Sequence, residues 1–162
     1  MEKLKVIVIG AGGRGQGYTN MMAEYPEKYQ VVGVAEPIDN RREYVKNKHN
    51  IPEENCFATW EHILERPKFA DIAIISTMDR MHFAPAMEAI RKGYNLLLEK
   101  PVAPTAEECK KIEAEAKKRC RSLIRKPSIR IGLESVHVRE LNSVNVPIEI
   151  RPLMRNTPPT KR

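Results

Sequence analysis

Six residues near the N-terminus have the spacing of a phosphate-binding loop. The segment Gly10-Ala11-Gly12-Gly13-Arg14-Gly15 matches G-x-G-x-x-G and directly follows the β-branched run Val6-Ile7-Val8-Ile9. In such a loop the first glycine permits a tight turn, the second admits a pyrophosphate and the third lets a helix pack closely. The helix N-terminus then offers free N–H groups to the phosphates. The pattern predicts a dinucleotide site formed by Gly10, Gly12, Gly13, Arg14 and Gly15.

An acidic residue closes the next expected strand. Glu36 lies 21 residues after Gly15 and follows the apolar run at 31–35. A carboxylate at this place can accept a hydrogen bond from a ribose 2′-hydroxyl and repels a 2′-phosphate, which favours NAD over NADP. Arg41 and Arg42 instead favour NADP, because a guanidinium there could pair with the 2′-phosphate. A methyltransferase that binds S-adenosylmethionine also has a glycine loop and such an acidic residue, so these features alone leave both classes open.

Polar side chains follow two later strands. Ser76, Thr77 and His82 come after the buried run at 72–75, and Glu99 and Lys100 come after the run at 96–98. Ligands of open α/β sheets bind at the carboxyl ends of the strands. An ammonium group beside a nicotinamide or a substrate hydroxyl can serve in binding or proton transfer. These residues are therefore candidates for the reactive end of the site.

Strands and helices alternate over the first 120 residues. The pattern predicts strands at 6–9, 29–35, 56–58, 72–75 and 95–98. It predicts helices from the glycine loop to about residue 25 and at 40–49, 60–66, 83–92 and 105–120. Thr105 and Glu108 have the spacing of a capping box for the last helix. Buried strands that alternate with helices predict an α/β fold, a doubly wound parallel sheet of the Rossmann type.

The 162 residues have an uneven charge distribution. Residues 1–120 have a net charge of +1, whereas residues 121–162 have +6 and are rich in arginine and proline. We therefore expect one domain over 1–120 and a basic tail over 121–162, with short strands near 129–131, 136–138 and 144–146. No apolar run suits a membrane span, and no signal-peptide pattern opens the chain, so we expect a cytoplasmic location. The three cysteines, an odd number without metal-like spacing, predict reduced thiols and no metal.

The combined motifs resemble the Gfo/Idh/MocA oxidoreductase family, the glucose–fructose oxidoreductase and inositol dehydrogenase group. The resemblance covers about residues 3–120, and its most specific mark is Glu-Lys-Pro at 99–101 after a G-x-x-L-L-L-type strand. It implies a Rossmann domain that binds NAD(P) and a sugar-like or polyol substrate. It also implies that Lys100 assists catalysis beside the nicotinamide and that Glu36 binds the adenosine ribose. Residues implied to line the nicotinamide are Ser76, Thr77, His82 and Glu99. A methyltransferase becomes a distant alternative.

The tail departs from the family pattern. Family members continue into a last strand and a large second domain that binds substrate, and no such pattern follows Cys120. We expect a truncated chain with little activity alone, in which the atypical tail replaces the second domain. A non-catalytic NAD-binding module is the alternative. Nucleic-acid binding through the tail is a distant alternative, because the tail has no aromatic residues for stacking. Self-association is expected, because loss of the second domain exposes apolar surface.

Overall fold

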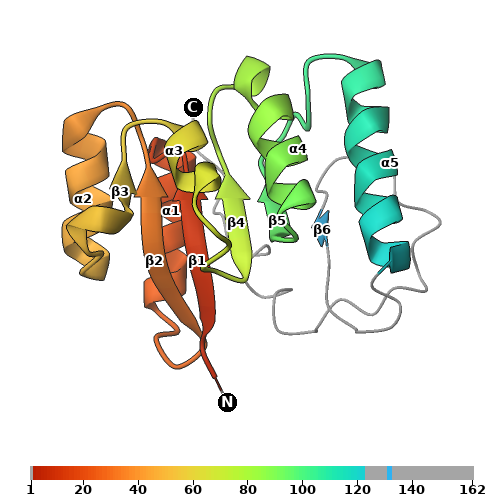
Figure 1. Cartoon of the computed structure of the whole chain (residues 1–162). Coiled ribbons are helices and arrows are strands. Elements are labelled where there is room, and N and C mark those ends of the chain that lie inside the picture. The colour runs from red at the N-terminus through yellow and green to blue at the C-terminus, as the bar shows by residue number, and fades with distance from the viewer. Residues whose placement is uncertain (1, 123–130, 133–162) are drawn as a thin grey trace, which may run out of the picture.

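The computed structural model describes residues 2–122 and 131–132, which form a parallel sheet between two layers of helices (Figure 1). Every strand pairing is parallel, and the strand order is β3-β2-β1-β4-β5-β6. The strands are β1 (Leu4–Ile9), β2 (Tyr29–Ala35), β3 (Cys56–Phe57), β4 (Ile72–Ile75), β5 (Asn95–Leu98) and β6 (Ile131–Gly132). The order reverses between β1 and β4, which is where doubly wound folds bind ligands.

The helices cover both faces of the sheet and bury a different core on each. The helices are α1 (Gly13–Ala23), α2 (Asp39–His49), α3 (Trp60–Glu65), α4 (Phe83–Arg91) and α5 (Ala106–Ser122), with short 3-10 turns η1 (Glu53–Asn55) and η2 (Asp79–Met81). Helices α3, α4 and α5 pack on one face with Ile7, Ile9 and Ile75. Helices α1 and α2 pack on the other with Val6 and Val8. Successive β1 residues therefore belong to opposite cores, as the continuous β-branched run predicts.

The observed elements confirm the predicted fold class, and most ends agree within two residues. The capping box at the start of α5 is also confirmed: the Glu108 N–H donates to Thr105 Oγ1 at 3.2 Å, and the Thr105 N–H donates back to Glu108 Oε2 at 3.3 Å. The sequence pattern did not predict the two 3-10 turns. Helix α1 ends at Ala23 rather than near residue 25, because Pro26 follows closely and the chain turns at 24–28.

The basic tail falls almost entirely outside the described residues. Of its three expected strands, the one at 129–131 overlaps β6, which pairs with β5 at Leu96 and Leu97. The strands expected at 136–138 and 144–146 lie outside the described residues. None of the helices in the described part of the chain combines the length and the apolar character needed to cross a bilayer.

The strand ends are level at the carboxyl edge of the sheet. Ile9 is in register with Ala35 of β2 and Ile75 of β4, and Ile75 is in register with Leu98 of β5. The next residue of each strand continues the ladder: the N–H of Gly10 donates to Ala35 O, that of Ser76 to Ile9 O and that of Glu99 to Ile75 O, at 2.8–2.9 Å. Four predicted site residues, Glu36, Gly10, Ser76 and Glu99, thus form one row across this edge.

Candidate functional site

The glycine loop crosses this edge in a conformation that requires glycine at two positions. Gly10 has φ +89°, and a Cβ there would lie 2.6 Å from the carbonyl oxygen of Ser76. A Cβ on Gly15 would lie 2.0 Å from the carbonyl oxygen of Gly10. Gly10 therefore makes the turn, and Gly15 lets α1 press directly on it, as the sequence motif predicts.

Helix α1 begins at the loop with Gly12 as its N-cap and has no acidic residue in its first turn. Its first N–H groups have no partner within the helix, and they carry the positive end of the dipole. A Cβ on Gly13 would meet nothing within 4 Å, so space is open beside this turn. The backbone here can hold a phosphate group, and nothing negative in the first turn opposes it.

Glu36 is fixed against the glycine loop. The residue is only 4% exposed, and its carboxylate accepts hydrogen bonds from the Ala11 N–H at 2.6 Å and the Ile38 N–H at 3.1 Å. Each carboxylate oxygen has two acceptor sites, so each retains one after these bonds. The structure therefore presents Glu36 beside the loop with acceptor capacity for a hydroxyl.

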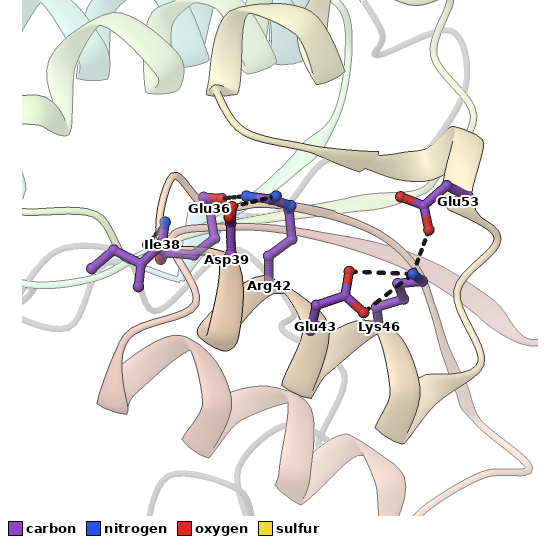
Figure 2. A network of polar contacts seen from close by, with 7 residues as sticks. All are labelled: Glu36, Ile38, Asp39, Arg42, Glu43, Lys46 and Glu53. Atoms are coloured by element: carbon purple, nitrogen blue, oxygen red, sulfur yellow. Dashed lines mark hydrogen bonds and ion pairs between the residues drawn. The ribbon is translucent and has the colours of Figure 1, made fainter.

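The two neighbouring arginines differ in their contacts. Arg42 donates to the Glu36 carbonyl oxygen at 2.6 Å and to Asp39 Oδ1 at 2.6 Å, which closes the first turn of α2 (Figure 2). Arg41 is exposed, and its guanidinium lies 4.0 Å from the position of a Cβ on Gly12. Arg41 thus flanks the glycine loop, whereas Arg42 is held by the local backbone.

Ser76 and Thr77 line the loop from the β4 side. Ser76 Oγ donates to the Gly10 carbonyl oxygen at 2.7 Å, which fixes the loop to β4. The Thr77 hydroxyl is buried and has no hydrogen-bond partner within the described part of the chain. A buried hydroxyl without a partner is costly, and a bound polar ligand at this edge would relieve that cost. Together with the glycine cradle, this orphaned hydroxyl fits a dinucleotide at the β1–β4 crevice.

His82 lies fully buried beneath the same edge. Its Nδ1 is 2.7 Å from the Pro101 carbonyl oxygen, and its Nε2 is 3.1 Å from the Thr77 carbonyl oxygen. A neutral imidazole donates to one of these carbonyls and a protonated imidazole donates to both. The ring therefore connects the loop after β4 with the loop after β5, and it has no surface open to a ligand.

Glu99 and Lys100 close the row on the β5 side. Glu99 Oε1 accepts the backbone N–H of Lys100 at 3.1 Å, and Arg14 Nε lies 3.9 Å from Glu99 Oε2. Lys100 itself is exposed. Tyr18 of α1 also donates to Glu99 Oε2, at 2.5 Å. The glycine-loop helix is thereby tied to the residue that precedes Lys100.

The structure thus places all the predicted residues around one edge of the sheet. Sequence reasoning missed Tyr18 and the Ala11 N–H. Tyr18 stands four residues after Arg14, so the two side chains share one face of the helix. This spacing could have identified Tyr18 as a neighbour of Arg14 from the sequence. The Ala11 contact left no trace in residue type, because a backbone N–H is present at every non-proline position.

Comparison with known proteins identifies the family of this chain. Residues 4–125 match the family model of the Gfo/Idh/MocA proteins, described as an oxidoreductase family with an NAD-binding Rossmann fold. This match covers most of the chain and includes every candidate site residue.

Two curated relatives illustrate the similarity. A trans-1,2-dihydrobenzene-1,2-diol dehydrogenase from Bos taurus is 29% identical over 113 residues, which are 69% of this chain and 33% of the relative. A scyllo-inositol 2-dehydrogenase (NADP(+)) from Bacillus subtilis (strain 168) is 26% identical over 108 residues, 67% of this chain and 28% of the relative. The chain therefore spans about a third of the length of these relatives.

Solved structures share the fold. The WlbA dehydrogenase from Bordetella pertussis, in complex with NADH and UDP-GlcNAcA, has a TM-score of 0.67 at 17% identity, covering 74% of this chain and 35% of that one. A myo-inositol 2-dehydrogenase from Lactobacillus plantarum has a TM-score of 0.68 at 18% identity, covering 81% and 36%. The family match and the shared fold lead to one conclusion: the chain belongs to the Gfo/Idh/MocA oxidoreductase family and carries its NAD-binding Rossmann domain.

Proposed function

We propose that this chain is the cofactor-binding part of an NAD-dependent oxidoreductase. In this proposal the first turn of α1, at Gly12, Gly13 and Arg14, holds the pyrophosphate, and Glu36 accepts a ribose hydroxyl. Ser76, Thr77 and Glu99 line the nicotinamide end. The observation that carries the proposal is the Ala11–Glu36 hydrogen bond of 2.6 Å, because it sets a shielded carboxylate directly beside the glycine loop.

A preference for NAD over NADP follows from the charges near Glu36. A 2′-phosphate would meet the Glu36 carboxylate at close range. Arg42 is already held by Asp39 and by the Glu36 carbonyl oxygen (Figure 2). The neighbouring Arg41 lies toward Gly12. These contacts support NAD as the preferred cofactor.

The reactive end is proposed to handle a sugar-like or polyol hydroxyl. NAD, when bound, supplies the hydride acceptor or donor. Lys100 Nζ would hydrogen-bond the substrate hydroxyl or pass on its proton while hydride moves to or from the same carbon. The relatives named for inositol and dihydrodiol substrates support a hydroxylated ring as the substrate class.

A non-catalytic NAD-binding module is the second candidate. It is favoured by the family match, because the matched region at residues 4–125 is described as an NAD-binding Rossmann fold. The two candidates differ in turnover. If the chain is an oxidoreductase domain, its fusion to the remaining two thirds of a relative should oxidise a polyol. If the chain is a binding module, the fusion protein should show no polyol oxidation.

Three features outside the site are also proposed. A domain limit near residue 120 is supported by the change in composition there, next to the end of α5 at Ser122. A cytoplasmic location is supported by the free thiols of Cys56 and Cys109. Self-association is supported by the exposed side chains of Met78 and Met81 near the carboxyl edge.

Calorimetric titration of the 162-residue chain with NADH and, separately, NADPH tests the main proposal. Saturable binding with NADH preferred is the expected result. If neither nucleotide binds, the proposed site is wrong. If NADPH binds more tightly, the role given to Glu36 is wrong while the dinucleotide site stands.

A further inference from the structure

The Tyr18 hydroxyl connects two parts of the site that are 81 residues apart in sequence. Tyr18 is on α1, one helical turn after Gly15, and Glu99 follows β5 at the opposite side of the β1–β4 crevice. The hydroxyl donates to Glu99 Oε2 at 2.5 Å. A hydroxyl–carboxylate hydrogen bond is charge-assisted and stronger than one between neutral groups.

The Glu99 carboxylate is shielded and uses both oxygens. Its side chain is 11% exposed. Oε2 accepts from Tyr18 and lies 3.9 Å from Arg14 Nε, and Oε1 accepts the Lys100 N–H at 3.1 Å. Arg14 is at the outer limit of an ion pair and its side chain is 59% exposed, so Tyr18 is the closest side-chain donor described for this oxygen. Tyr18 therefore sets the orientation of the carboxylate.

That orientation bears directly on Lys100. The carboxylate that Tyr18 fixes also holds the backbone of Lys100, whose side chain extends from this point. Without the Tyr18 bond, Oε2 keeps only the longer Arg14 contact described for it, and a turn of the carboxylate toward Arg14 would lengthen the contact of Oε1 with the Lys100 N–H. The position of the lysine thus depends on a hydroxyl located on the glycine-loop helix.

We propose that Tyr18 is a positioning residue for the nicotinamide end of the site, acting through Glu99 on Lys100. This inference rests on the proposed function, because it requires a nicotinamide beside Lys100. Tyr18 does not itself take part in the chemistry. Its removal should affect the nicotinamide part of the cofactor and leave the adenosine and pyrophosphate part unaffected.

Comparing NADH with ADP-ribose, which lacks the nicotinamide, tests the proposal by calorimetry on the full chain. The Tyr18→Phe variant should bind NADH about tenfold more weakly than the original chain. It should bind ADP-ribose with unchanged affinity. Tyr25→Phe is the matched control. Tyr25 lies just after the far end of the same helix and packs against the core formed with α1 and α2. The Tyr25→Phe variant should bind NADH and ADP-ribose as tightly as the original chain does.

A second arm separates positioning from a merely structural role. In a Glu99→Ala background, Tyr18→Phe should cause no further loss of NADH affinity, because the acceptor of its hydrogen bond is gone. Unchanged NADH binding by Tyr18→Phe would overturn the proposal. Equal weakening toward NADH and ADP-ribose would also overturn it, since that pattern means a disturbed helix. If the unsubstituted chain binds neither ligand, the proposed function itself has failed.

Discussion

The backbone N–H of Ala11 lies 2.6 Å from the carboxylate of Glu36, 25 residues further along the chain. One hydrogen bond thus joins the two halves of the dinucleotide motif. The carboxylate also accepts the Ile38 N–H, so its place is set from the loop and from the start of α2 together. Glu36 is consequently a structural part of the glycine loop as well as a candidate ligand contact.

Replacing Glu36 with glutamine should alter cofactor preference. The amide retains one acceptor oxygen but has no negative charge, so it accepts a ribose hydroxyl less well and no longer repels a 2′-phosphate. We expect about tenfold weaker NADH binding and a smaller difference between NADH and NADPH, both measured by calorimetry. The exposed Glu27→Gln variant is the control. An unchanged ratio of the two affinities would contradict the assigned role.

Gly15→Ala should destabilise the domain. Its Cβ would lie 2.0 Å from the backbone oxygen of Gly10, a contact that only a shift of α1 can relieve. We expect a loss of about 3 kcal/mol in the free energy of unfolding, measured with urea. Gly17→Ala in the same helix meets nothing within 4 Å and should instead gain about 0.5–1 kcal/mol. Equal stabilities of the two variants would refute the close approach.

His82→Leu should weaken the connection between the loops after β4 and β5. Leucine cannot donate to the carbonyl oxygens of Thr77 and Pro101, which leaves at least one buried acceptor unsatisfied. The expected cost is about 2 kcal/mol in the free energy of unfolding. The exposed His62→Leu variant should remain close to the original chain. A His82→Leu protein as stable as that control would show that the ring is not a structural tie.

Stability should fall on mild acidification because of His49. Burial, with Lys48 adding to it, lowers the pKa of His49 below its ordinary value of 6.5. The unfolded chain therefore takes up a proton at this residue before the folded chain does, so the stabilisation is complete above pH 6.5 and declines as the pH falls toward the lower folded pKa. The free energy of unfolding, measured across this window, should decrease less in His49→Gln than in the original chain or in His62→Gln. Identical slopes in all three would rule out His49 as the cause.

The sequence predicted most of the fold because its signals were local. A continuous β-branched run identified β1, a short apolar run identified β4, and the spacing of Thr105 and Glu108 identified the start of α5. The 3-10 turn at Asp79–Met81 lacked such a signal, since its residues have no common pattern and the turn depends on Met78 accepting the Met81 N–H at 2.7 Å.

The sequence could predict which residues form the candidate site, but not the hydrogen bonds between them. Glycines and acidic residues at fixed spacing revealed which positions meet at the edge of the sheet. The internal bonds of the site, such as Ser76 to Gly10 and Tyr18 to Glu99, join segments 66 and 81 residues apart. Such pairings depend on the level strand ends, which only the folded sheet defines.

Strand β1 contributes alternate side chains to two separate cores. This alternation restricts insertions and deletions within the strand. Deleting one residue within Val6–Ile9 would send each later side chain of the strand to the opposite face, so Ile9 would point toward α1 and α2. Both cores would be mismatched at once. During evolution of this domain, insertions and deletions should therefore occur mainly in the connecting loops, whereas β1 should keep a constant length.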